Sequence, residues 1–309
     1  MNRFLAHTGA KYPIIQAPMG WIARSPLASA VCNAGGVGII ETSSGETDNC
    51  KAEIEKMPGL TDGPFGVNLP IMFLKDDSML RYICESGVKF VTTSAGSPKK
   101  FLAPLQEAGI VVYHAVPTVE AALKCADAGV DGLVVEGGEG GGFKNPEEVS
   151  TMVLLQAIAE KVDLPLVAAG GICDGRGMAA AFALGAEAVQ MGTRFVSCAE
   201  SPVHHNFKQA IIDAPTDGTV MLNKASSPCV RALKTERSQQ MYAEGNMPMT
   251  TLATVKDLYF GGDMEASVGL AGQSAGLIHE VKSVANIIEE TVNEFHTICE
   301  RMGNIGKAF

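Results

Sequence analysis

Residues 164–172 read LPLVAAGGI, and residues 190–195 read QMGTRF. The first stretch is a short apolar run that ends in a glycine pair, as a buried parallel strand does. In the second, a glycine closes another apolar run, residues 188–191. Glycine lets the backbone approach an anion closely, and N–H groups in such turns bind phosphate. The two stretches predict a parallel sheet with a phosphate site where adjacent strands end; turns without a ligand are the alternative.

The same succession of helix, glycine and apolar run recurs along the chain, as NAGG before residues 37–40 and as ESG before residues 88–91. Glycine after the last helical turn is the cap that lets the chain reverse into a strand. A period of roughly 20–25 residues is that of a βα unit in a closed barrel. We therefore expect an α/β fold, a (β/α)8 TIM barrel. The eight expected strands are residues 14–17, 37–40, 65–69, 90–93, 111–115, 132–135, 166–168 and 188–191.

The regular alternation stops after the eighth expected strand. Residues 204–214 have the pattern of a helix, and residues 215–263 mix polar, methionine-rich and Gly/Pro segments without strand runs. We expect a small helical insertion, about residues 203–263, that forms a lid over the barrel mouth. The chain closes with an amphipathic helix from residue 281 to about residue 302. Residues 1–309 are thus expected to form one barrel domain with this insertion.

The composition is that of a globular protein, with 46% hydrophobic residues, 19% charged residues and a net charge of −10. The negative charge argues against nucleic acid or an anionic membrane surface as the main partner. The eight cysteines are scattered singly, so we expect no metal site, no disulfide framework and a reducing, cytoplasmic compartment. The sequence contains no apolar run long enough to span a bilayer and predicts no signal peptide. It leaves the oligomeric state open, with a homodimer among the candidates.

Several polar or glycine-rich stretches follow the expected strands, at the end of a parallel barrel where active sites lie. Residues 136–142 hold five glycines in seven positions, which suggests a large flat ligand close to the backbone; flexibility alone is the alternative. Asn68 can donate and accept at once, as a pyrimidine-like edge requires, or it caps a turn. Gln190 either contacts the ligand or is an amide satisfied inside the barrel. A phosphorylated flat cofactor fits this set, and FMN is the simplest candidate.

Six motifs carry a resemblance that covers nearly the whole chain. They are QAPMG at residues 16–20, GVN at 66–68, EGGEGGG at 136–142, AGG at 169–171, MGTRF at 191–195 and AGQSAG at 271–276. In this order they resemble the nitronate monooxygenase (2-nitropropane dioxygenase) family, which includes FMN-dependent enoyl-acyl-carrier-protein reductases and NADH:quinone reductases. The resemblance implies FMN as cofactor. The residues it assigns to FMN are Ala17, Pro18, Met19, Gly20, Asn68, Gly141, Ala169, Gly170, Gly171, Gln190, Gly192, Thr193 and Gln273.

The chain departs from the family at Phe143, because the glycine loop of nitronate-oxidising and enoyl-reducing members ends in a histidine there. Phenylalanine cannot accept a proton, so the usual base for abstracting an α-proton is missing. We expect Phe143 to line the substrate pocket, where it stacks on a flat acceptor or fills the mouth. His114 is another histidine at an expected strand end. It is our candidate catalytic and substrate-contacting residue, with a packed structural histidine as the alternative.

With the base missing, hydride chemistry fits best. The resemblance implies an FMN-dependent oxidoreductase that passes hydride from NAD(P)H through FMN to a small-molecule acceptor, an enoyl thioester or a quinone. One alternative is a nitronate monooxygenase, in which FMN and O2 oxidise a preformed nitronate. Another is a barrel like IMP dehydrogenase, in which Cys173 would be the catalytic cysteine, although a structural cysteine is the simpler interpretation at the phosphate turn. The last alternative is a barrel that binds a phosphorylated metabolite without catalysing a reaction.

Overall fold

Eight parallel strands form one sheet in the order β1-β9-β8-β6-β5-β4-β3-β2 in the computed structural model, which describes residues 1–74, 76–225 and 229–307. A bridge between Ile15 and Val37 joins the two ends of this order and closes the sheet into a barrel. The expected (β/α)8 barrel is confirmed, with each strand within one residue of its predicted bounds. The strands are β1 (Ile14–Gln16), β2 (Gly38–Ile40), β3 (Phe65–Pro70), β4 (Phe90–Ser94), β5 (Val111–Val116), β6 (Gly132–Glu136), β8 (Leu166–Ala169) and β9 (Ala188–Met191).

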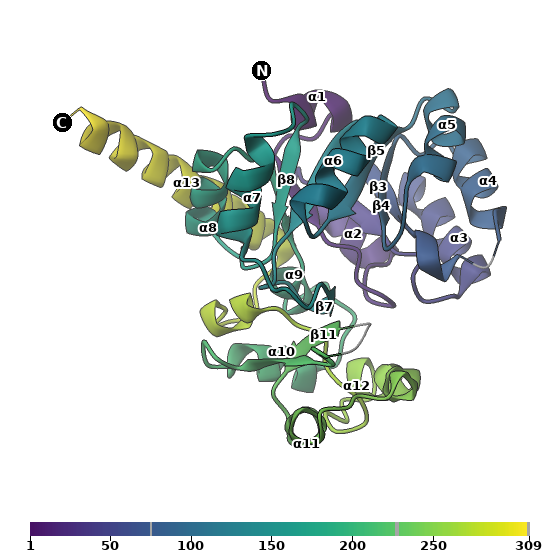
Figure 1. The fold of residues 1–309 in the computed structure, drawn as a ribbon, viewed down its shortest axis with the longest axis vertical. Coiled ribbons are helices and arrows are strands. Elements are labelled where there is room, and N and C mark those ends of the chain that lie inside the picture. Colours follow the sequence, from purple (N-terminus) through teal and green to yellow (C-terminus); the bar gives the residue numbers. More distant parts are fainter. Residues whose placement is uncertain (75, 226–228, 308–309) are drawn as a thin grey trace.

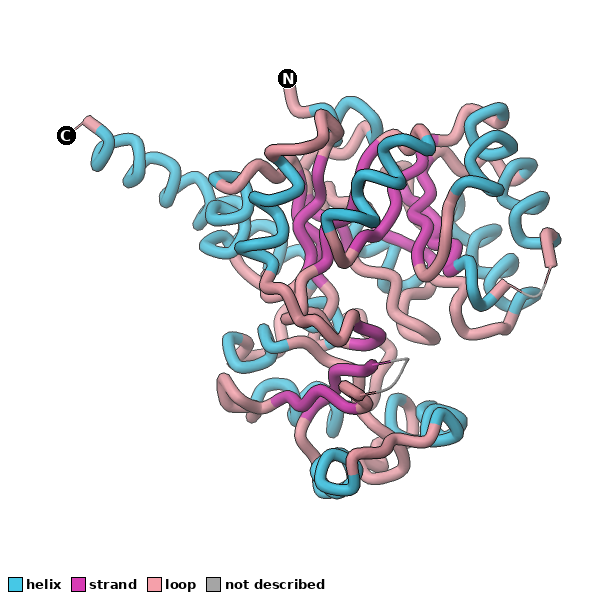
Figure 2. Tube along the Cα trace, viewed as in Figure 1, coloured by secondary structure: helices cyan, strands magenta, loops and turns pink. Residues whose placement is uncertain are grey.

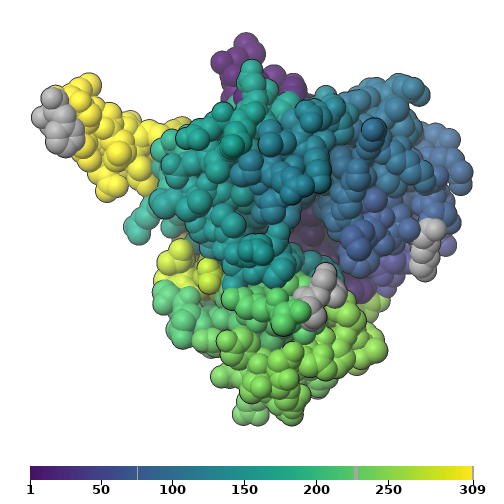
Figure 3. Space-filling view, in the orientation of Figure 1, coloured from purple at the N-terminus to yellow at the C-terminus, as the bar shows by residue number. Residues whose placement is uncertain are grey.

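Helices surround the sheet on its outer side (Figure 1). They are α2 (Ser25–Asn33), α3 (Thr47–Lys56), α4 (Ser78–Glu85), α5 (Lys99–Glu107), α6 (Val119–Ala128), α7 (Thr151–Ala159), α8 (Gly175–Ala183) and α13 (Val284–Gly306). A further helix, α1 (Arg3–Thr8), lies at the amino ends of the strands, where its Phe4 enters the barrel interior. The last helix packs its first half against α8 and α2, and its end extends away from the body (Figures 1 and 3). In the described ranges, no helix has the length and apolarity needed to cross a membrane.

The barrel strands alternate between two buried faces, as the two-residue period of a strand requires. One face packs against the helices, and the other fills the barrel interior. An aromatic cluster of Phe4, Phe90 and Tyr113 fills the interior toward the amino ends of the strands. The apolar filling leaves the carboxyl ends of the strands as the place for polar side chains on the interior face.

A cap covers the carboxyl ends of the barrel strands, and it is more than helical. Its helices include α10 (His205–Ile212), α11 (Glu236–Glu244) and α12 (Val255–Tyr259), as expected for this segment. The expectation of no strands there is wrong, because β10 (Thr219–Leu222) and β11 (Cys229–Leu233) form an antiparallel sheet with β7 (Gly142–Lys144) (Figure 2). Every residue of both strands is buried, and alternate residues pack on a small apolar cluster, so neither strand has the exposed polar face of a half-buried strand. The third strand comes from the loop after β6, so two distant parts of the chain build the cap sheet.

Candidate active site

A row of polar side chains crosses the interior face at the carboxyl ends of the strands. Asn68 on β3 lies beside Thr92 on β4, and Glu136 on β6 lies beside Ala169 on β8, which in turn neighbours Gln190 on β9. Asn68 is 3% exposed, and its Nδ2 donates to the carbonyl and hydroxyl oxygens of Thr92 at 3.2 and 3.0 Å. These bonds fix the orientation of the Asn68 amide. The structure therefore brings Asn68, Ala169 and Gln190 to one end of the barrel, as expected.

The turns after β8 and β9 present open backbone donors. Gly170 and Gly171 have φ of +98° and +75°, a left-handed conformation that strains residues with a side chain. The amides of Gly171, Gly192 and Thr193 donate no hydrogen bond to another described residue. Buried or half-buried N–H groups seek an acceptor, so the two turns fit a phosphate group supplied by a ligand.

The glycine loop after β6 is packed tightly against other parts of the chain. A Cβ atom on Gly141 would lie 2.6 Å from the carbonyl carbon of Ala271, and one on Gly137 would lie 2.2 Å from Oγ1 of Thr151. Four of the five loop glycines have protein atoms within 3 Å of that position, and only the last has space around it. Flexibility is therefore not the reason for these glycines. Protein atoms, rather than a flat ligand, make much of the close contact with these glycines.

The late segment 271–273 joins the glycine loop to the phosphate turn. The amide of Gly272 donates to Oγ1 of Thr193 at 2.9 Å, and the amide of Gln273 donates to the carbonyl of Glu139 at 2.8 Å. These bonds, together with the close packing of Gly141 on Ala271, place Gly141, Thr193 and Gln273 near one another, and their contact with FMN stays a prediction. The side chain of Gln273 is exposed, so the backbone of this residue, and not its amide group, does the joining.

The loop after β1, which carries Ala17, Pro18, Met19 and Gly20, lies beside the phosphate turn. The amide of Ala17 donates to the carbonyl of Met191 at 2.9 Å, and a Cβ atom on Gly192 would lie 3.6 Å from that of Ala17 and 4.0 Å from Sδ of Met19. The first and last strands of the barrel thus deliver both loops to one corner.

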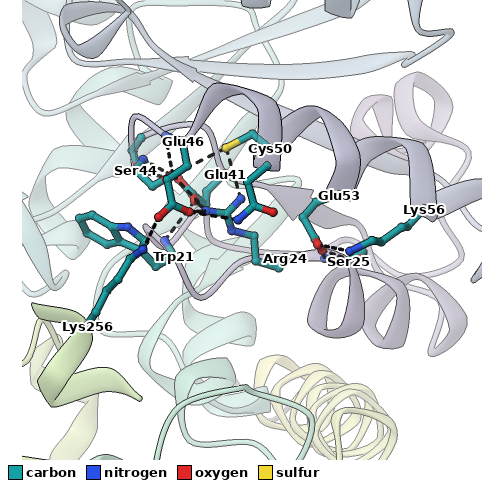
Figure 4. Close-up of polar contacts among 12 residues, drawn as sticks. Trp21, Arg24, Ser25, Glu41, Ser44, Glu46, Cys50, Glu53, Lys56 and Lys256 are labelled. Carbon is teal, nitrogen blue, oxygen red and sulfur yellow. Dashed lines mark hydrogen bonds and ion pairs between the residues drawn. The ribbon is translucent and has the colours of Figure 1, made fainter. Parts of the chain in front are cut away.

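A buried carboxylate fixes the far end of the β1 loop. Glu41 is fully buried and accepts hydrogen bonds from the amides of Trp21 at 3.1 Å and Ser44 at 3.0 Å. Arg24 lies 2.7 Å from the same carboxylate and also contacts Glu46 at 3.1 Å (Figure 4). Trp21 has φ of +62°, a conformation that the Glu41 contact holds in place. The sequence did not predict that Glu41 holds the β1 loop. The only signal for it was an acidic residue directly after an expected strand.

The same network reaches the cap. Lys256 on α12 forms an ion pair with Glu46, which holds the pKa of that carboxyl below its usual range (Figure 4). On the other side, Arg231 of β11 is 4% exposed and donates from Nε to the carbonyl of Gly138 at 2.8 Å. Two cationic side chains of the cap are therefore bound to loops at the barrel mouth, one on each side.

Phe143 lies on β7 at the mouth and is 40% exposed. Its ring is 5.6 Å from the ring of Phe73, which follows β3 and is 44% exposed. The pair presents two partly exposed aromatic rings at the mouth. The structure thus places an exposed aromatic ring there, and its contact with a flat substrate stays a prediction.

His114 lies apart from the other candidate residues, on the side of β5 that faces the helices. Its neighbours Tyr113 and Ala115 face the barrel interior, whereas Val112 and Val116 face the helices, and His114 shares their side of β5. Burial lowers the pKa of His114 to about 4, against a raising contribution from a hydrogen bond with the Gly96 backbone. Its Nδ1 lies 2.7 Å from Oγ1 of Thr93. These contacts are those of a packed structural histidine.

Cys173 is also buried, with 6% of its surface exposed. Burial, with a smaller contribution from Asp174, raises the pKa of its thiol to about 12. A thiol in that state is not a nucleophile at neutral pH. The structure thus removes the main support for a cysteine mechanism of the IMP-dehydrogenase kind.

The fold and the site define a capped (β/α)8-barrel protein with a corner of open backbone donors. The chain belongs to the nitronate monooxygenase family, whose model matches residues 2–81 and 74–294. The structure of FabK from Thermotoga maritima superposes with a TM-score of 0.94 at 37% identity, over 99% of both chains. A nitronate monooxygenase of Pseudomonas aeruginosa is 31% identical over 95% of this chain and 99% of its own.

A third relative comes from Mycobacterium tuberculosis and is named as (3aS,4S,5R,7aS)-5-hydroxy-7a-methyl-1-oxo-octahydro-1H-indene-4-carboxyl-CoA dehydrogenase. It is 36% identical over 75% of this chain, and the match spans 66% of its own length, just under two thirds.

Proposed function

We propose that this protein is an FMN-dependent oxidoreductase that passes hydride from NAD(P)H to an electrophilic small-molecule acceptor, an enoyl thioester or a quinone. The observation that carries the proposal is the group of open amides at Gly171, Gly192 and Thr193 on two adjacent turns. Backbone donors at such a corner bind the phosphate of a cofactor without a basic side chain. This suits a protein whose net charge is −10.

The residues around this corner have distinct parts in the proposal. The turns at residues 169–171 and 192–193 hold the phosphate, and Gly141 lies near the ribityl chain. The β1 loop, residues 17–20, and Asn68 border the flat ring, and the orientation of Asn68 is set by Thr92. FMN would supply the ring that accepts and donates hydride. The chain binds that ring, orients it and excludes water from one side by means of the cap, which we propose as the lid.

Phe143 argues for hydride transfer over proton abstraction, because the side chain offers no basic atom near the mouth. Its exposed ring, paired with Phe73, provides a stacking surface for a flat acceptor or for nicotinamide. The mycobacterial relative named as a carboxyl-CoA dehydrogenase supports a thioester among the acceptors. The second candidate function is oxidation of a preformed nitronate with O2, which the family and the P. aeruginosa relative favour and which needs no deprotonation.

Anaerobic reduction of the flavin-loaded protein tests the proposal. NADH or NADPH should bleach the flavin absorbance, and a quinone or an enoyl-CoA should then be added separately to identify the acceptor that restores it. O2 uptake by the oxidised, flavin-loaded protein on addition of a nitronate, without NAD(P)H, would favour the second candidate. A protein that binds FMN and is reduced by neither nucleotide would be a non-catalytic binder, and one that does not bind FMN would refute the proposal.

A further inference from the structure

Trp21 is the single tryptophan of the chain, and its backbone is strained. Its φ of +62° lies in the left-handed region, which a residue with a large side chain rarely adopts. Such strain persists only where the surrounding structure holds it, and it is common at functional sites. Trp21 directly follows the β1 loop, residues 17–20, which would border the proposed flavin ring. The contacts that hold Trp21 therefore also shape one wall of the proposed cofactor site.

A single oxygen atom, Oε1 of Glu41, contacts both the Trp21 amide and Arg24. The amide of Trp21 donates to it at 3.1 Å, and Nη2 of Arg24 lies 2.7 Å from it. The Glu41 side chain is fully buried, so water cannot replace this cation. Burying an unpaired carboxylate is strongly unfavourable. The contact between Glu41 and Trp21 thus depends on Arg24 remaining beside the carboxylate.

The Nη2 atom of Arg24 has more acceptors around it than it has protons. It carries two protons, but Oε1 of Glu41, Oγ of Ser44 and Oε2 of Glu46 lie 2.7, 3.0 and 3.1 Å away (Figure 4). The other carboxylate oxygen of Glu46 pairs with Lys256 of the cap helix α12. With Lys256 in place, two cations face two carboxylates. Without Lys256, both carboxylates depend on one guanidinium group, and Glu46 competes with Glu41 for it.

We propose that Arg24 is a positioning residue that couples the cap to the β1 loop. Lys256 neutralises Glu46, so Arg24 remains with its other carboxylate partner. That partner, Glu41, then holds Trp21 and the loop before it. The coupling stands on these contacts alone, whereas its effect on a bound flavin rests on the proposed function. A cap bound to the barrel thereby fixes the loop that borders the cofactor, and by reciprocity a bound cofactor favours the bound cap.

The fluorescence of Trp21 measures the coupling in the protein without FMN, since no other tryptophan contributes. Lys256→Met should increase the acrylamide quenching constant of Trp21 at least about twofold, because the strained backbone loses its fixed acceptor. Lys234→Met is the matched control, since it removes another cap lysine from an exposed ion pair, with Asp217. Quenching in this control should equal that of the wild type.

Adding Glu46→Gln to Lys256→Met separates competition for Arg24 from a simple contact of the cap. The uncharged amide no longer competes with Glu41, so the quenching constant should return to within about 1.5-fold of the wild type. The double variant still lacks Lys256, so a direct effect of the lysine on the indole ring would persist in it. Unchanged quenching in Lys256→Met, or a change that Glu46→Gln does not reverse, would overturn the inference.

Titration with FMN then tests the effect on the cofactor. Lys256→Met should weaken FMN binding at least about threefold, and the double variant with Glu46→Gln should recover the wild-type affinity. An unchanged affinity in a Lys256→Met protein whose quenching has changed would overturn the link between the coupling and the cofactor. A wild type that binds no FMN would refute the proposed function, whereas the quenching results would still decide whether the cap is coupled to Trp21.

Discussion

Replacement of His114 tests whether the outer face of β5 was assigned correctly. The pKa of His114 is about 4 in the folded protein, against 6.5 for an ordinary histidine, because burial opposes its charged form. Above pH 6.5 the residue is neutral in both states. Between pH 6.5 and pH 4 the unfolded chain takes up a proton that the folded chain does not, so stability falls as the pH is lowered.

The size of this effect follows from the two pKa values. Between pH 7 and pH 5, His114 should account for a loss of about 2 kcal/mol in the free energy of unfolding, since one pKa unit corresponds to about 1.4 kcal/mol. His114→Asn removes the titrating group while leaving a polar atom near Oγ1 of Thr93. The variant should therefore lose about 2 kcal/mol less than the wild type over this range.

Urea unfolding at pH 7 and pH 5, followed by circular dichroism, measures the difference. His296→Asn, on the exposed side of α13, is the control and should follow the wild type. Equal losses in the His114 variant and the wild type would refute the burial argument. Because His114 faces the helices, flavin affinity and flavin reduction should also stay within about twofold. A folded variant that binds flavin but whose flavin cannot be reduced would show that His114 takes part in the active site.

Three further outcomes are expected. Gly171→Ala should weaken FMN binding at least about tenfold. The control is Gly87→Ala, because Gly87 has a φ of +80°, close to the +75° of Gly171, and open space around it; this variant should lose only about 1–2 kcal/mol of stability. Titration of flavin fluorescence measures the FMN affinity of both variants, and equal affinities would count against the phosphate corner. Phe143→His should gain oxidation of neutral nitroalkanes, measured by oxygen uptake, and an unchanged rate would contradict our account of that position. Lys256→Met should change the free energy of unfolding by less than about 1 kcal/mol. It should nevertheless increase hydrogen exchange in α12, because the ion pair with Glu46 links α12 to the barrel. Unchanged exchange would show that the pair does not hold the cap.

The sequence predicted the barrel because its evidence is local. Apolar runs, several of them preceded by a helix and a glycine, place every strand within one residue, and the glycines at 170, 171 and 192 mark the turns that the structure leaves with open donors. Short-range chemistry controls both features, since a turn with positive φ favours glycine and a buried strand requires an apolar run. The cap strands escaped detection because both are buried throughout.

Tertiary structure decided which side chains meet. The alternation of Tyr113 and His114 was visible in the sequence, but both faces of a parallel barrel strand are buried, so the pattern cannot say which face is the interior. The pairing of Lys144 with Glu136 and the anchoring of Gly138 by Arg231 depend on how the cap sheet folds back over the mouth. Contacts of this kind join residues through space, and the chain carries no local mark of them.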